Sequence, residues 1–214
     1  MKLAPLMLML IMLTGCVNYL RSYTFEEAYV AVRKIDSKYD TAVHVEQLAI
    51  RMVPRDKIEP MLQDLRILRQ KVNQSRSGPD ATMIENFFLA RMLMLESQRD
   101  FQIAAQIGLR GLVTDGYRCE EMESIAKSRI YLRDALAKGT LAMDHMDLVL
   151  QEPEGQRLLG INENKPRFYE SPFRDISAER KAQRAALLKC MEEAGVTEQI
   201  LTEQFGPSVL EDQS

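Results

Sequence analysis

The residues of this chain whose side chains could do chemistry are few: three cysteines and two histidines among 214 residues. His145 lies between Met143 and Met146, and a soft thioether beside an imidazole is a ligand set that suits copper. The alternative is a helix whose methionines face the core while the neighbouring aspartates are solvated. His44 lies in an apolar run and is expected to be an ordinary core or surface histidine. We therefore expect no metal site, with Met143, His145 and Met146 as the remaining candidates for one.

The chain lacks the short motifs that mark common active sites. No HExxH, GxSxG, glycine-rich phosphate loop or CxxC occurs in it. Glu120-Glu121 and Glu192-Glu193 are adjacent acidic pairs on expected helices, so the two members of each pair point to different sides. They are expected to be solvated rather than to form an acid–base pair. These observations favour a protein that is not an enzyme and that carries no cofactor.

The N-terminal residues have the layout of a secretory signal. Lys2 supplies a positive charge, residues 3–13 are almost wholly Leu, Met and Ile, and small residues follow. This apolar run has about eleven residues, whereas a membrane-spanning helix needs about twenty. It ends in Leu13-Thr-Gly-Cys16, which resembles the lipobox of bacterial lipoproteins: leucine, two small residues and the cysteine that carries the lipid. The alternatives are an ordinary signal peptide with a chance cysteine, or a short N-terminal anchor.

The lipobox resemblance implies a membrane anchor and a compartment. Residues 1–15 are then a signal peptide, Cys16 is the lipidation site, and residues 16–23 are the lipidated N-terminus and linker. Two or more acyl chains, such as palmitate, hold a protein firmly on a membrane. Val17 rather than an aspartate follows the cysteine, which favours the periplasmic face of an outer membrane.

With Cys16 acylated, Cys119 and Cys190 remain as an even pair in an oxidising compartment. A disulfide between them would close a loop of about seventy residues and contribute about 4 kcal/mol in the chain-entropy model. It requires the two Cα atoms to lie within about 7 Å of each other. The alternative is two free, half-buried thiols, and the sequence leaves both open.

Arginine and aromatic residues alternate in the stretch 152–176, which carries three prolines and two glycines and is expected to be a long irregular loop. Aromatic and arginine side chains are favoured anchors of protein interfaces. The candidate partner-binding residues are Arg167, Phe168, Tyr169, Phe173 and Arg174. The alternative is that the three aromatic rings only fasten the loop to the core.

Helical periodicity runs through nearly all of the remaining chain, so the expected fold class is all-α. Thr24 and Glu27 form a capping box at a helix start, and Gly195 and Gly206 mark helix ends. We expect an irregular helical bundle, or a short array of antiparallel helical hairpins, in a single domain over residues 24–206. A disordered acidic tail is expected at 207–214. The expected helices cover residues 24–39, 40–53, 57–73, 80–96, 101–112, 118–138, 141–151, 177–194 and 197–205.

Two of the expected hairpins, 80–113 and 118–151, each span about thirty-four residues, which is the period of a tetratricopeptide repeat. In the first, Arg99-Asp-Phe101 followed by Ala104 is similar to the turn and the small residue of that repeat. In the second, Asp144 stands where the small residue belongs. The resemblance implies hairpins that stack around a concave groove, against the alternative of a plain irregular bundle.

The charge pattern narrows the class of partner. The net charge is −3, and loss of Lys2 with the signal peptide makes it one unit more negative. No basic tract follows Cys16, so nothing favours nucleic acid. The sequence therefore predicts a lipid-anchored periplasmic interaction or scaffold protein, an accessory of an envelope or secretion assembly whose protein partner is unknown. The alternative is a small-ligand or metal-binding lipoprotein centred on His145.

Overall fold

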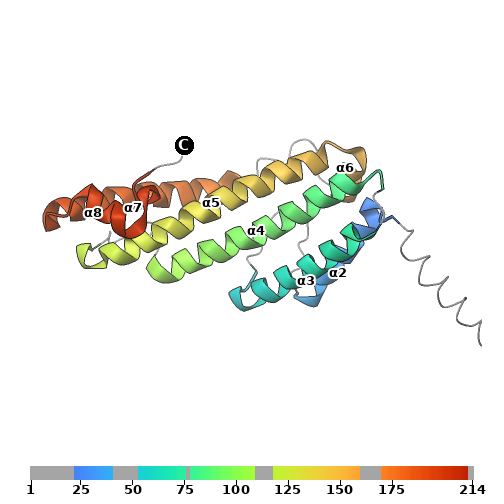
Figure 1. Cartoon of the computed structure of the whole chain (residues 1–214), viewed down its shortest axis with the longest axis horizontal. Helices are drawn as coiled ribbons and strands as arrows, with labels where there is room; N and C mark the ends of the chain where they lie inside the picture. Colours follow the sequence, from blue (N-terminus) through green and yellow to red (C-terminus); the bar gives the residue numbers. More distant parts are fainter. Residues whose placement is uncertain (1–21, 41–52, 76–77, 109–117, 160–169, 212–214) are drawn as a thin grey trace, which may run out of the picture. The chain divides into compact units, whose positions relative to one another are not determined.

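The fold is all-α, as expected: within the described residues every regular element of the computed structural model is a helix (Figure 1). The structure describes residues 22–40, 53–75, 78–108, 118–159 and 170–211. The elements are α2 (Phe25–Lys38), α3 (Arg55–Asn73), α4 (Ala81–Gly108), η2 (Cys119–Glu121), α5 (Met122–Leu150), α6 (Pro153–Leu159), α7 (Glu170–Ala194), α8 (Glu198–Phe205) and η4 (Pro207–Val209). The signal segment, residues 41–52 of the expected helix 40–53, and His44 lie outside the described residues.

The chain is organised as two compact units, where the sequence predicts a single domain over 24–206. Unit 1 contains α2, α3 from Glu59, α4 up to Met92, α5 from His145, and α6. Unit 2 contains α3 up to Ile58, α4 from Leu93, η2, α5 up to Asp144, and α7, α8 and η4. The two longest helices thus each contribute one part to each unit.

Unit 1 is built on the amphipathic face that the sequence indicates for α2. The capping box is present: the Thr24 hydroxyl accepts from the Glu27 amide, and the Glu27 carboxylate accepts from the Thr24 amide, both at 3.2 Å. Phe25 is fully buried and meets Phe87 of α4 edge to face, with ring centroids 5.5 Å apart. Asp36 accepts from Arg91 at 2.7 Å, an ion pair that is almost completely buried.

Unit 2 is held by an apolar core and by buried polar links between its helices. One of its apolar clusters contains Ile125, Ala126, Leu187, Met191, Leu201 and Val209. The Gln183 amide of α7 donates to the Ser128 hydroxyl of α5 at 3.0 Å, which in turn donates to the Ala104 carbonyl of α4 at 3.2 Å. Because buried polar groups need partners, this chain of bonds fixes how α4, α5 and α7 meet.

The expected turn at 97–100 is wrong, because α4 runs without a break through these residues. The polar side chains that indicate a turn are instead buried and bonded to α5. The Ser97 hydroxyl donates to the Ala135 carbonyl at 2.6 Å, and Asp100 accepts from Lys138 and from Arg99. Tertiary partners satisfy these groups, so the helix has no need to end.

The expected turn at Gly139-Thr140 is also wrong, because α5 runs without a break through these two residues. The Thr140 hydroxyl donates back to the Leu136 carbonyl at 3.0 Å, which keeps it inside the helix. Each of the ranges 80–113 and 118–151 therefore contains one long helix where the sequence predicts a hairpin. The predicted array of antiparallel hairpins is not the arrangement of these two ranges.

The expected irregular loop over 152–176 is also wrong in its extent. Pro153 begins α6, where a proline suits the first turn, and α7 begins at Glu170, before the expected cap at Ser177. Gly155 permits the tight approach of α6 to the end of α5, because a Cβ there would lie 2.0 Å from the Val149 carbonyl oxygen. Residues 160–169 lie outside the described part.

The expected disordered tail is wrong for residues 207–211. Residues 207–209 form η4, Val209 is fully buried in the core of unit 2, and residues 212–214 lie outside the described part. The ends of the preceding helices agree with the sequence: α7 stops at Gly195 with φ 64°, and α8 stops at Gly206 with φ 86°. Among the described helices, none has the length and apolarity needed to cross a membrane.

Candidate functional site

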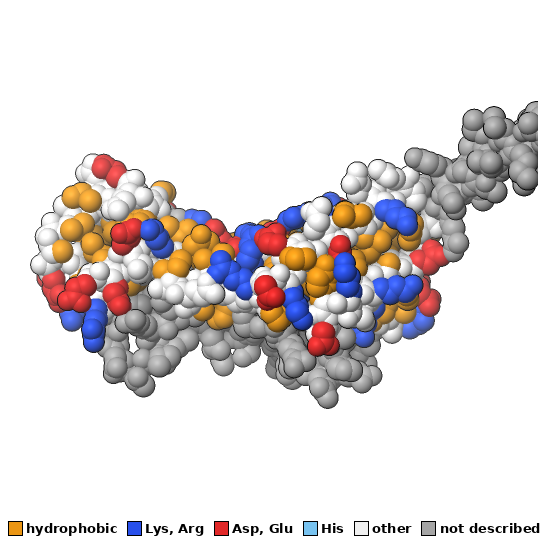
Figure 2. Space-filling model, turned by 90° about the horizontal axis from the view of Figure 1, so that it is seen from below, with side chains coloured by type: hydrophobic (Ala, Val, Ile, Leu, Met, Phe, Trp, Pro, Cys, Tyr) orange, Lys and Arg blue, Asp and Glu red, His pale blue; other side chains and the backbone are white. Residues whose placement is uncertain are grey.

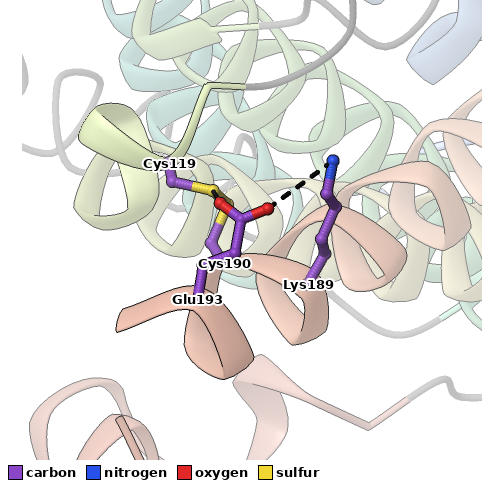
Figure 3. The surroundings of a disulfide bond; sticks show 4 residues. All are labelled: Cys119, Lys189, Cys190 and Glu193. Atoms are coloured by element: carbon purple, nitrogen blue, oxygen red, sulfur yellow. Dashed lines mark hydrogen bonds and ion pairs between the residues drawn. A yellow bond between two sulfur atoms is a disulfide. The ribbon is translucent and has the colours of Figure 1, made fainter. Parts of the chain in front are cut away.

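The feature of unit 2 that bears most directly on function is the disulfide between Cys119 and Cys190 (Figure 3). The sulfur atoms are bonded, and the Cα atoms lie 5.0 Å apart, within the range that a disulfide needs. The structure thereby selects the bonded pair from the two alternatives that the sequence leaves open. The bond joins η2, which precedes α5, to the C-terminal part of α7.

Charged side chains of α7 lie beside this bond. One carboxylate oxygen of Glu193 is 3.2 Å from Cys119 Sγ, and the other is 3.7 Å from the Lys189 ammonium (Figure 3). A disulfide sulfur has no proton to donate, so the first contact is a close polar approach rather than a hydrogen bond. Cys190 is almost fully buried and Cys119 is half-buried. Cys119 is therefore the less buried of the two bonded cysteines, and Glu193 lies beside its sulfur.

A second constellation in unit 2, which we call the tail clamp, consists of Arg129, Arg180 and Arg184 with the carbonyls of residues 209–211. Arg129 is fully buried, and its guanidinium donates to the carbonyls of Val209 and Glu211 and to the Arg180 carbonyl. Arg180 also donates to the Glu211 carbonyl, at 2.8 Å, and Arg184 donates to the Leu210 carbonyl at 2.9 Å. The tail clamp fastens the C-terminal segment to α5 and α7.

Sequence reasoning missed the tail clamp, although one signal of it is present. Arg129 falls at helical spacing between Ile125 and Leu132, so it shares one helix face with these apolar residues. An arginine on an apolar stripe must find partners when buried. The partners are backbone carbonyls far along the chain, which no local pattern identifies.

The candidate metal ligands of α5 have a different setting. His145 Nδ1 lies 3.0 Å from the Asn86 side-chain oxygen of α4, so that nitrogen is engaged within unit 1. Met143 and Met146 are half-buried. Within the described ranges no three His, Cys, Asp or Glu side chains are grouped so that they could hold a metal ion. Asn86 and His145 link α4 to α5, and the metal-binding hypothesis stays a prediction.

Beside this pair, Glu85 of α4 accepts two hydrogen bonds from Arg69 of α3. These bonds lower the pKa of Glu85 below its usual value, against the opposing effect of partial burial, and His145 adds a small contribution in the same direction. A lowered pKa means that the folded state binds fewer protons than the unfolded state near that pH. The stabilisation is therefore complete above the ordinary pKa of a glutamate and is lost as the pH falls through the lower pKa of the folded state.

We expect Glu85→Gln to weaken unit 1 at neutral pH and to make little difference in acid. The urea midpoint of each protein, measured from about pH 7 to about pH 3, should show the gap between them closing as the pH falls. Glu152→Gln, at an exposed position, is the matched control and should show a constant gap. A gap that stays constant for Glu85→Gln would mean that the ion pair adds nothing to stability.

The candidate partner-binding residues fall largely outside the described part. Arg167, Phe168 and Tyr169 lie outside it, and Phe173 and Arg174 belong to α7, whose side chains are described only from Ile176 onwards. Cys16 also lies outside. On the face drawn in Figure 2, acidic and basic side chains are interspersed among apolar ones. Large apolar side chains are exposed at Val30, Ile67, Leu141, Leu148 and Ile200.

Comparison with known proteins adds no relative. No protein-family model matches this chain, no curated protein is significantly similar to it in sequence, and no solved structure is significantly similar to it. The class that the structure defines is thus an all-α protein with one disulfide in its second unit.

Proposed function

We propose that this protein is lipid-anchored at the periplasmic face of a bacterial outer membrane and that its helical part binds another protein of the envelope. The observation that carries the proposal is the disulfide between Cys119 and Cys190. Disulfides form and persist in oxidising compartments, of which the periplasm is one. The pairing leaves Cys16, in the lipobox-like tetrapeptide, as the one cysteine outside this bond.

The anchor hypothesis gives Cys16 a role that requires no partner cysteine. A thioether-linked lipid consumes the thiol, so the remaining two cysteines form the bond without competition. Two or more acyl chains hold a protein on a membrane for long times. The folded part beginning at Thr24 would then stay close to the membrane surface, tethered by residues 16–23.

Cys16→Ser should abolish lipidation and release the protein from the membrane fraction. The check is mass spectrometry of the N-terminal peptide together with fractionation of cells that express the full chain. The wild-type peptide should begin at Cys16 and carry the mass of the lipid. A mature peptide that begins elsewhere, or an unmodified Cys16, would contradict the proposed localisation.

The proposed interaction role rests on the sequence, which contains no HExxH, GxSxG, glycine-rich phosphate loop or CxxC motif. Aromatic and arginine residues, which are favoured anchors of protein interfaces, lie together at 167–174. A photoreactive amino acid placed at Phe168 or Tyr169 in intact cells should cross-link to one defined envelope protein. Ala185, an exposed residue of α7, is the control position and should give no such product. Equal, diffuse cross-linking at both positions would contradict an interface at 167–174.

A further inference from the structure

The disulfide brings together two acidic pairs that are far apart in the sequence. Glu120 and Glu121 follow Cys119 directly, and Glu192 and Glu193 follow Cys190 within three residues. Consecutive Cα atoms are about 3.8 Å apart, so all four carboxylates are carried by residues near the bond. Arg118 and Lys189 are the cationic residues directly preceding the two cysteines. The chain segments that carry the disulfide thus have an excess of negative charge.

Glu193 is the member of this group that touches the bond. Its carboxylate oxygen lies 3.2 Å from Cys119 Sγ, and Lys189 offsets its charge only from 3.7 Å and with a side chain that is 74% exposed (Figure 3). Glu193 also lies in the last turn of α7, where the helix dipole disfavours a carboxylate. The helix dipole therefore does not favour an acidic residue at this position, and the i,i+4 pair with Lys189 contributes only about 0.2–0.5 kcal/mol to the helix.

We propose that Glu193 shields the disulfide from thiol–disulfide exchange by repelling thiolates that approach Cys119. Exchange begins when a thiolate of the reductant attacks one sulfur in line with the S–S bond. Cys190 is only 1% exposed, so the attack falls on Cys119 Sγ, beside the Glu193 carboxylate. The proposal concerns the bond itself and does not depend on lipidation of Cys16.

The reaction that is slowed can be written with a dithiol as reductant. Its thiolate forms a bond to Cys119 Sγ, the bond to Cys190 breaks, and Cys190 leaves as a thiolate that takes up a proton. The second thiolate of the dithiol then attacks the other sulfur of the same dithiol, which is bonded to Cys119 in the mixed disulfide. Cys119 leaves as a thiolate. The dithiol is oxidised by two electrons and the protein disulfide is reduced by two. Glu193 opposes the first step by repelling the attacker and the second by disfavouring a thiolate at Cys119.

The test compares the rates at which dithiothreitol reduces the wild-type protein and Glu193→Gln under native conditions near neutral pH. Free thiols are counted by alkylation and mass spectrometry. Glu193→Gln should be reduced about three- to tenfold faster, with the difference shrinking as salt is added. Glu192→Gln changes the exposed neighbour of Glu193 and should be reduced within about twofold of the wild-type rate.

Two further measurements separate electrostatic shielding from a loosened fold. An uncharged phosphine reductant is not repelled by a carboxylate, so it should reduce wild type and Glu193→Gln at nearly equal rates. Lys189→Gln removes the positive charge that partly offsets the charge of Glu193. It should therefore make reduction by dithiothreitol slower than in the wild type. Equal dithiothreitol rates for wild type and Glu193→Gln, or an equal acceleration with the phosphine, would overturn the proposal.

Discussion

Arg129→Met is expected to lower the free energy of unfolding by about 3–5 kcal/mol, because it removes the donor from backbone carbonyls that stay buried or partly buried. The Arg129 side chain is fully buried, and its guanidinium donates hydrogen bonds to the carbonyls of Val209, Arg180 and Glu211. Methionine fills much of the same volume without any donor. Each carbonyl that stays buried without its donor costs about 1–3 kcal/mol.

The loss of stability in Arg129→Met should be concentrated in unit 2, because Arg129 fastens the C-terminal segment to that unit. Val209 packs in the same core cluster as Ile125 and Leu187, so a loosened tail exposes apolar surface as well as carbonyls. The measurement is urea unfolding followed by circular dichroism. Arg184→Met is the control: Arg184 also donates to a carbonyl of the tail, that of Leu210, but it is exposed and water can replace it.

Arg184→Met should cost about 1 kcal/mol or less, as is usual for exposed positions. An equal loss in both variants would mean that the tail clamp acts through its individual hydrogen bonds and not through the burial of Arg129. A stability of Arg129→Met equal to that of the wild type would contradict the clamp altogether.

Replacing both Cys119 and Cys190 by alanine is expected to lower the free energy of unfolding by about 4 kcal/mol. The two residues are 71 positions apart, and their bond restricts the unfolded chain over that whole length. Restricting the unfolded state raises its free energy, and the effect grows slowly with the length of the loop. The urea midpoint of the double variant, compared with that of the oxidised wild type, measures it.

Two controls make this result specific to the bond. Fully reduced wild-type protein should unfold at nearly the same urea concentration as the double variant. Cys16→Ser should leave the midpoint unchanged, because Cys16 takes no part in the bond. If the wild-type mass in the absence of reductant shows two free thiols at Cys119 and Cys190, the expected difference disappears.

Local signals in the sequence predicted several features of the fold correctly. The capping box of Thr24 and Glu27 begins α2 one residue from the expected start, and the helix ends at Gly195 and Gly206 lie where the sequence places them. Apolar residues at helical spacing, such as Phe25 and Leu65, are also fully buried. These signals succeed because a helix start, a helix end and a buried stripe depend on residues about four positions apart.

Two of the wrong predictions, the turn at 97–100 and the disordered tail, share one physical cause. Ser97 and Asp100 are typical turn residues by type, yet they lie inside α4 because Ala135 and Lys138 of α5 satisfy them. The tail was expected to be disordered, yet Arg129 binds the carbonyls of Val209 and Glu211. In each case the deciding hydrogen bond joins residues distant in the sequence, and residue type alone does not reveal such a partner.

The sequence by itself determined the helical class of this protein, the positions of its best-capped helices, and the tetrapeptide ending in Cys16 on which the anchor hypothesis rests. Only the tertiary structure decided that Cys119 pairs with Cys190, that α4 and α5 are unbroken, and that Glu193 borders the disulfide. The physical reason is the distance along the chain over which each feature is decided. Helix formation is settled within a turn or two of chain, whereas a disulfide, a buried arginine and a shielding carboxylate depend on which distant segments the packed core brings together.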